Sequence, residues 1–164
     1  LSAAKYMYEL GQFSVAALAA ERAAAGMPES VAAWHQLALA QSSLGNIPLA
    51  LQAASQVCAL EPTIAANFRH IGSLHGALGQ WPEAERAYDA GAQLGGGDAS
   101  LYRFAAAAMW EQGRSEDALA YLAAAITKYP DAWELPFMAA HILFASRRDK
   151  EAMAMATDAV ASYF

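Results

Sequence analysis

The sequence contains little charge and a single cysteine, and each shortage excludes a class of protein. Charged side chains make up 16% of the 164 residues, whereas they make up about a quarter of an ordinary soluble domain. The 16 acidic side chains outnumber the 10 basic ones, so the net charge is −6. This balance argues against broad attraction to nucleic acid or to an anionic membrane. The one cysteine, Cys58, excludes an internal disulfide and leaves the redox compartment undecided.

Long apolar runs are also missing. No stretch approaches the roughly 18 uninterrupted apolar residues of a membrane span, and Lys5 and Glu9 interrupt any apolar region at the N-terminus. We therefore expect neither membrane insertion nor a signal peptide within this sequence. The cell compartment stays open, with the cytoplasm slightly favoured. Alanine takes the place of the missing charge and favours closely packed helices, and the alanine-rich, lysine-poor composition hints at a GC-rich bacterial source.

Three columns of residues recur at a spacing of 34. The first column holds glycine at four steps and arginine at the fifth: Gly11, Gly45, Gly79, Gly113 and Arg147. The second column follows five residues later and holds alanine at every step: Ala16, Ala50, Ala84, Ala118 and Ala152. The third follows the glycine by 17 residues and holds residues that end helices: Pro28, Pro62, Gly96 and Pro130. Three independent columns with one period indicate an internal repeat along the whole chain.

Each repeat predicts a pair of helices. Before each glycine the apolar residues follow the i, i+3, i+4, i+7 spacing of an amphipathic helix. The glycine then supplies a turn that few other residues tolerate. Pro48 and Pro82 suit the first turn of a second helix, and Ser115, ahead of two acidic residues, is predicted to cap another. The predicted helices span residues 1–10, 13–26, 31–44, 47–60, 65–78, 81–94, 99–112, 115–128, 133–146 and 149–162.

The repeat resembles the tetratricopeptide repeat. The aromatic–Leu–Gly…Gly…Ala…aromatic…Ala…Pro signature of that family is clearest from Trp34 to Pro62 and from Phe68 to Gly96. The resemblance covers essentially the whole chain, and the last repeat departs from it, with Arg147 in the glycine column. It implies an all-α fold, a right-handed superhelical solenoid of antiparallel helix hairpins, as a single domain over residues 1–164. The repeats are expected at about residues 1–30, 31–64, 65–98, 99–132 and 133–164.

The position of each chain end within its 34-residue repeat shows how much of the first and last repeats is present. Counted from the glycine column, the first repeat lacks four residues and the last lacks two. No polar capping helix closes the predicted stack, although such stacks normally need one. We therefore expect either a segment of a longer protein or a partner that covers the open end. The apolar residues concerned are Met153, Met155, Tyr163 and Phe164.

The resemblance implies a concave groove, lined by the first helix of each hairpin, that binds a protein or peptide. In this family the second, fifth, ninth and twelfth residues of a repeat face the groove. Carried onto this sequence, those positions give the candidate partner-binding residues Tyr8, His35, Leu39, Arg69, Ser73, Arg103, Trp110, Phe137, His141 and Phe144. Arginine offers a planar fork that suits carboxylates, and aromatic rings supply desolvated anchors. We therefore expect a partner with an acidic group near Arg69 and Arg103 and an apolar anchor against Trp110.

The sequence shows only weak signals for a catalytic, metal-binding or phosphate-binding site. His70 and His75 lie on divergent sides of a predicted helix, and no cysteine or carboxylate completes a metal-ligand set with them. The run Gly95-Gly96-Gly97-Asp98 lacks the Lys-Ser/Thr of a phosphate loop and is interpreted as a connecting turn. Cys58 is interpreted as a buried, inert thiol. We predict no catalytic residue, no metal and no cofactor, and therefore no enzyme.

Several functions stay open at this point. The first is an adaptor or scaffold whose groove captures a peptide or protein. The second is a structural scaffold that self-associates through its uncapped ends, and the third is a regulatory or substrate-recruiting arm of a larger enzyme. A narrower resemblance, on the run Val57-Cys58-Ala59-Leu60-Glu61-Pro62, is to the tetratricopeptide chaperones of bacterial type III secretion. Those chaperones carry fewer repeats than this chain.

Overall fold

The computed structural model describes residues 2–95 and 98–163, and over these residues it contains α-helices joined by short turns and no strand. The all-α prediction is therefore confirmed. The chain forms two compact units, Leu1–Gly79 and Gln80–Phe164, which are called unit 1 and unit 2.

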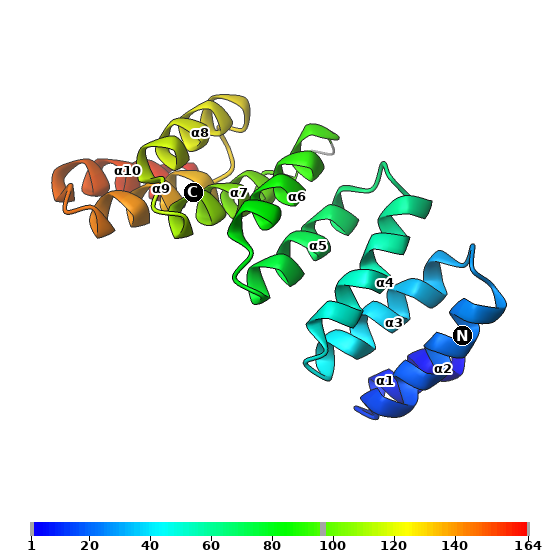
Figure 1. The fold of residues 1–164 in the computed structure, drawn as a ribbon. Coiled ribbons are helices and arrows are strands. Elements are labelled where there is room, and N and C mark those ends of the chain that lie inside the picture. The colour runs from blue at the N-terminus through cyan, green and yellow to red at the C-terminus, as the bar shows by residue number, and fades with distance from the viewer. Residues whose placement is uncertain (1, 96–97, 164) are drawn as a thin grey trace. The chain divides into compact units, whose positions relative to one another are not determined.

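Unit 1 is built from successive antiparallel helix pairs (Figure 1). Its helices are α1 (Ser2–Glu9), α2 (Phe13–Gly26), α3 (Val31–Ser43), α4 (Ile47–Leu60) and α5 (Ala65–Ala77). Each helix packs against the next one along the chain, and α1 also contacts α3. Leu37 and Leu74 are the large residues of a core that otherwise consists of buried alanines, so the helices approach one another closely.

Unit 2 repeats this arrangement with larger side chains in its core. Its helices are α6 (Trp81–Gln93), α7 (Ser100–Glu111), α8 (Ser115–Lys128), α9 (Glu134–Ala145) and α10 (Asp149–Tyr163). Successive helices pack against one another, and α7 also contacts α9. The largest fully buried side chains of the described residues all lie here: Leu101, Leu122, Leu135 and Ile142. The first helices α7 and α9 are thereby held side by side.

The alanine column is buried in the core in every repeat. Its five members are buried, with exposed fractions between 0% and 6%. A larger side chain at these positions would push the helices apart, because packed interiors leave no room for added atoms. Pro48 and Pro82 lie in the first turns of α4 and α6, as predicted from their tolerance of that position.

The glycine column forms the turn inside each helix pair. Gly11, Gly45, Gly79 and Gly113 have φ between 68° and 76°, a left-handed conformation that costs other residues about 1–2 kcal/mol. Arg147, which occupies this column in the last repeat, adopts the same conformation with φ 61°. The turn of the last repeat therefore forms in spite of the missing glycine.

The helix boundaries agree with the predicted ones to within one residue, but the predicted cap of α8 is wrong. Ser115 is the first residue of the helix, and Arg114 occupies the N-cap position without a side-chain capping bond. The helix begins directly after the one non-helical residue that follows the left-handed Gly113, so Ser115 is already helical. The side chain of Arg114 instead bonds the carboxylate of Asp117, with Nε 2.8 Å from Oδ2.

At the C-terminal end, Met153 is 73% exposed and Met155 is half-buried. The side chain of Tyr163, and Phe164, lie outside the described residues.

Candidate functional site

The candidate residues of unit 2 lie together on α7 and α9. Phe137 is 59% exposed and Phe144 is 68% exposed, and His141 between them is exposed as well. Arg103 and Trp110, on α7, are half-buried. We call the surface of Arg103, Trp110, Phe137, His141 and Phe144 the first-helix face of unit 2. Large aromatic side chains left in solvent are typical of surfaces that bind a partner.

A cleft of about 370 Å³ opens on this face. Arg103 and Phe137 line it together with Ser100, Trp133 and Glu134. The rings of Trp133 and Phe137 meet edge to face, with centroids 6.1 Å apart, and Trp133 is 43% exposed. The cleft thus combines an apolar wall of two rings with one cation and one carboxylate.

The guanidinium of Arg103 is held in place by a neighbouring ring. Its Cζ lies 4.1 Å from the ring centroid of Phe104, a cation–π contact. The ring of Phe104 in turn stacks on Tyr88 of α6, with centroids 5.3 Å apart. The stacked pair thus holds the guanidinium of Arg103, a residue that lines the cleft.

A second pair of rings joins α7 to α9. Trp110 and His141 meet edge to face, with ring centroids 5.1 Å apart. Both were predicted from the repeat positions, and the structure brings them together.

In unit 1 the candidate residues lie on α1, α3 and α5 and carry fewer exposed rings. Tyr8 is half-buried, and its hydroxyl lies 3.1 Å from the hydroxyl of Ser43. Leu39 is half-buried on α3, and Arg69 and Ser73 are exposed on α5. This face is therefore mostly polar and offers hydrogen bonds more than apolar anchors.

The two candidate helices α3 and α5 are joined by histidines. The rings of His35 and His70 meet edge to face, with centroids 6.3 Å apart. Burial lowers the pKa of His70, and the neighbouring His35 lowers it further. Protonation of His70 is therefore unfavourable in the folded chain, because the charge would be partly desolvated beside a second ring that can be charged.

Ion pairs fix the turns that precede α8 and α10. Arg114 Nη1 lies 2.8 Å from Glu85 Oε2 of α6, and Arg148 Nη1 lies 2.9 Å from Glu116 Oε1 of α8. Arg148 also pairs with Glu151, which lowers the pKa of that carboxyl group. These contacts link successive second helices and leave the first-helix face free of this network.

The other groups singled out in the sequence show no arrangement for chemistry. Cys58 is half-buried where full burial was predicted, and desolvation raises the pKa of its thiol, which disfavours the reactive thiolate. Residues 2–95 and 98–163 contain no cluster of three His, Cys, Asp or Glu side chains suited to a metal. In the glycine run, Gly95 is left-handed and the carboxylate of Asp98 accepts a hydrogen bond from the backbone of Ser100. Gly96 and Gly97 lie outside the described residues.

Some residues of the cleft were missed in the sequence. Ser100 and Glu134 occupy the second position of their repeats, which the family pattern assigns to the groove, so their signal was available. Trp133 lies one residue earlier and carried no such signal. The contact between His35 and His70 was also missed, although both lie on first helices of adjacent repeats.

A comparison with protein families shows what class of protein this geometry defines. Family models described as tetratricopeptide repeat match residues 1–63, 71–132 and 109–163. The chain belongs to the tetratricopeptide repeat family. A comparison with curated proteins finds no match.

Solved structures of the same class share the fold. The crystal structure of MamA has a TM-score of 0.81 at 16% identity, over 97% of this chain and 93% of that one. TTC0263 from Thermus thermophilus has a TM-score of 0.66 at 22% identity, over 99% and 89%. YrrB, described as a tetratricopeptide protein with an unusual peptide-binding site, has a TM-score of 0.65 at 18% identity, over 90% and 76%. At these identities the likeness concerns the fold alone.

The family and the fold together make this chain a protein-interaction module whose partners are proteins or peptides. Within the part of the chain that the structure describes, no helix has both the length and the hydropathy that crossing a bilayer requires.

Proposed function

We propose that the chain acts as an adaptor or scaffold that captures a peptide segment of a partner on its first helices, with the first-helix face of unit 2 as the main contact. The observation that carries this proposal is the aromatic character of the face in unit 2, where Phe137 and Phe144 are more exposed than buried. Leaving two rings in water is unfavourable, and covering them on binding recovers free energy in proportion to their area. YrrB, which has the same fold, is described as having an unusual peptide-binding site, so peptide binding is known for this fold.

The chemistry of the unit 2 cleft defines what the partner supplies. An apolar side chain of the partner fits against Trp133 and Phe137, and hot spots of this kind dominate binding energies. Arg103 donates hydrogen bonds to a carboxylate or a backbone carbonyl of the partner, although Glu134 in the same lining offsets its charge. The apolar anchor therefore contributes most of the affinity, and the acidic group contributes selectivity.

The test compares two exposed apolar residues of unit 2. A partner is captured from a lysate with the full chain, purified, and titrated by calorimetry against wild type, Phe137→Ala and Met153→Ala. Phe137 lies on the first-helix face, whereas Met153, on α10, lies off it and is 73% exposed. We expect Phe137→Ala to raise the Kd about tenfold or more and Met153→Ala to leave it unchanged. Equal affinities for wild type and Phe137→Ala, both folded by circular dichroism, would contradict the proposal.

A second candidate function is self-association, which the surface of α10 favours. Met153 and Val160 are 73% and 58% exposed on this helix. A second copy of the chain that packs on α10 would cover both. Light scattering over a range of concentrations separates the two functions, because self-association predicts a mass that rises with concentration and that Met153→Glu abolishes, whereas the adaptor alone predicts a constant monomer mass.

A further inference from the structure

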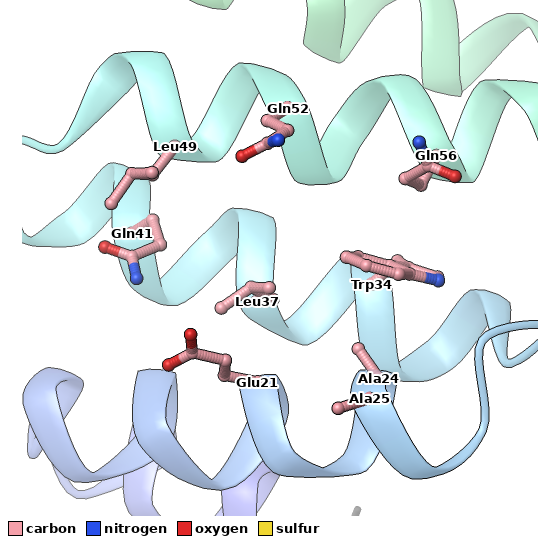
Figure 2. Close-up of a pocket in the computed structure, with 9 residues that line it drawn as sticks. All are labelled: Glu21, Ala24, Ala25, Trp34, Leu37, Gln41, Leu49, Gln52 and Gln56. Atoms are coloured by element: carbon pink, nitrogen blue, oxygen red, sulfur yellow. The ribbon is translucent and has the colours of Figure 1, made fainter.

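Unit 1 contains a second cleft, which no candidate residue lines. It has a volume of about 290 Å³ and lies between α2 and α4, with α3 as its floor (Figure 2). Its lining consists of Glu21, Ala24, Ala25, Trp34, Leu37, Gln41, Leu49, Gln52 and Gln56. The volume is at the small end of ligand pockets, so the cleft suits one large side chain.

This cleft opens on a different face of α3 from the candidate partner-binding residues. Trp34, Leu37 and Gln41 share one side of the helix, whereas His35 and Leu39 lie about 150° around its axis, since each residue turns the helix by about 100°. A ligand in the cleft and a peptide on His35 and Leu39 therefore contact separate sets of side chains.

Unit 2 shows how the equivalent position is filled by the chain itself. Two repeats after Glu21 and Trp34, the same columns hold Asp89 on α6 and Tyr102 on α7. Tyr121 of α8 donates its hydroxyl to Asp89 Oδ1 at 2.6 Å, and its ring lies 5.6 Å from that of Tyr102. One tyrosine thus donates to the acidic group on α6, which also accepts from Gln93 Nε2 at 3.3 Å, and contacts the aromatic ring on α7.

In unit 1 the residue equivalent to Tyr121 is Ala53, which supplies neither the ring nor the hydroxyl. Among residues 2–95 and 98–163, no group hydrogen-bonds the carboxylate of Glu21, which is directed from α2 toward the cleft (Figure 2). The indole N–H of Trp34 donates to the carbonyl of Pro28 at 2.7 Å, so the part of Trp34 that lines the cleft is its apolar ring.

We propose that this cleft binds a tyrosine side chain of a partner protein, with its ring against Trp34 and Leu37 and its hydroxyl donated to Glu21. The partner's tyrosine then occupies in unit 1 the role that Tyr121 has in unit 2. Gln52 and Gln56, both exposed on α4 at the rim of the cleft, carry donors and acceptors that match the backbone amides of the segment around the tyrosine.

The test uses two probes that differ by one hydroxyl. The full chain, labelled with ¹⁵N, is titrated with N-acetyl-tyrosinamide and with N-acetyl-phenylalaninamide, and the indole N–H resonance of Trp34 is followed after assignment with Trp34→Phe. Single residues bind weakly, so the Kd is on the order of millimolar. We expect saturable shifts of the Trp34 resonance and an affinity about fivefold higher for the tyrosine derivative, because a hydrogen bond is worth about 1 kcal/mol.

Two variants test whether the carboxylate of Glu21 causes the difference in affinity between the two derivatives. Glu21→Ala should reduce the affinity for the tyrosine derivative to that for the phenylalanine derivative, whereas Glu29→Ala, an exposed carboxylate outside the cleft, should leave both affinities unchanged. Equal affinity of the two derivatives for wild type, or shifts that spare Trp34, would overturn the proposal. Tighter binding of N-acetyl-lysinamide would overturn it too and would assign the cleft to a cation. Phe137→Ala should not affect these titrations, so failure here and failure of the proposed function are distinguishable.

Discussion

The rings of Trp110 and His141 meet edge to face with centroids 5.1 Å apart, which joins the first helices of two successive repeats into one surface. Such contacts between aromatic rings are worth about 0.5–1.5 kcal/mol beyond the area they bury. Because α7 and α9 also contact each other directly, this surface is fixed before a partner arrives. A fixed surface loses little conformational freedom on binding, which favours affinity.

The two arginines of the candidate set should act through charge. Arg69→Ala combined with Arg103→Ala should weaken binding of the captured partner and flatten its dependence on salt, because the contacts removed are electrostatic. Calorimetry at low and physiological salt measures both effects. The matched control is Arg22→Ala combined with Arg86→Ala, which removes one exposed cation of a second helix from each unit. An unchanged affinity in the variant with Arg69→Ala and Arg103→Ala would show that binding needs no acidic group on the partner.

The turn glycines should be replaceable only at a cost in stability. Gly45 has φ 76°, and a Cβ added there meets no atom within 4 Å, so Gly45→Ala tests backbone strain alone. We expect a loss of about 1 kcal/mol in the free energy of unfolding, measured with urea. Gly26→Ala is the control, since its Cβ also meets open space but the residue is helical, and it should gain about 0.5 kcal/mol. Equal effects of the two changes would show that the turn conformation is not strained.

The hydroxyl of Tyr121 should stabilise unit 2. Burial and the bond to Asp89 raise the pKa of Tyr121 above its usual value, so the group stays a neutral donor. Tyr121→Phe removes a hydrogen bond to a charged acceptor, and we expect it to lower the free energy of unfolding by about 1–2 kcal/mol. Tyr6→Phe removes a hydroxyl from a side chain that is 58% exposed and should change nothing. A loss as large in Tyr6→Phe would refute the role assigned to Tyr121.

The histidine pair should make unit 1 less stable in acid. The pKa of His70 is lowered from 6.5 in the folded chain, so below pH 6.5 the unfolded chain binds a proton that the folded chain resists. Stability therefore falls as the pH drops from about 6.5 toward the lower pKa of the folded state. Urea unfolding at pH 7.5 and 5.5 should show this loss in wild type and a smaller loss in His70→Gln. An equal loss in both proteins would show that other groups cause it.

The fold was largely predictable because it depends on the backbone and on small residues. The columns of Gly45 and Ala50 carry the turn and the small buried side chain in every repeat, and both requirements can be recognised from residue type. The left-handed turn at Arg147 shows that tertiary packing overrides local preference once the neighbouring helices form. The cap predicted at Ser115 was wrong because residue type alone does not fix where a helix begins.

The candidate site was predictable only in part. The repeat places Arg103, Trp110 and Phe137 on first helices, which the structure confirms. The repeat does not determine the orientation of these long side chains. The position of the Arg103 guanidinium depends on Phe104, whose ring stacks on Tyr88 of another helix, and Trp133 lines the cleft through its ring contact with Phe137. The sequence places Ala53 and Tyr121 in the same column, but the importance of that difference becomes clear only from the contacts of Tyr121 with Asp89 and Tyr102.

Hydrogen–deuterium exchange of the full chain with its captured partner tests the central claim most directly. The account predicts slower exchange on binding in residues 100–111 and 134–145, the first helices of unit 2. Slower exchange confined to residues 115–128 and 149–163, with the first helices unchanged, would contradict it.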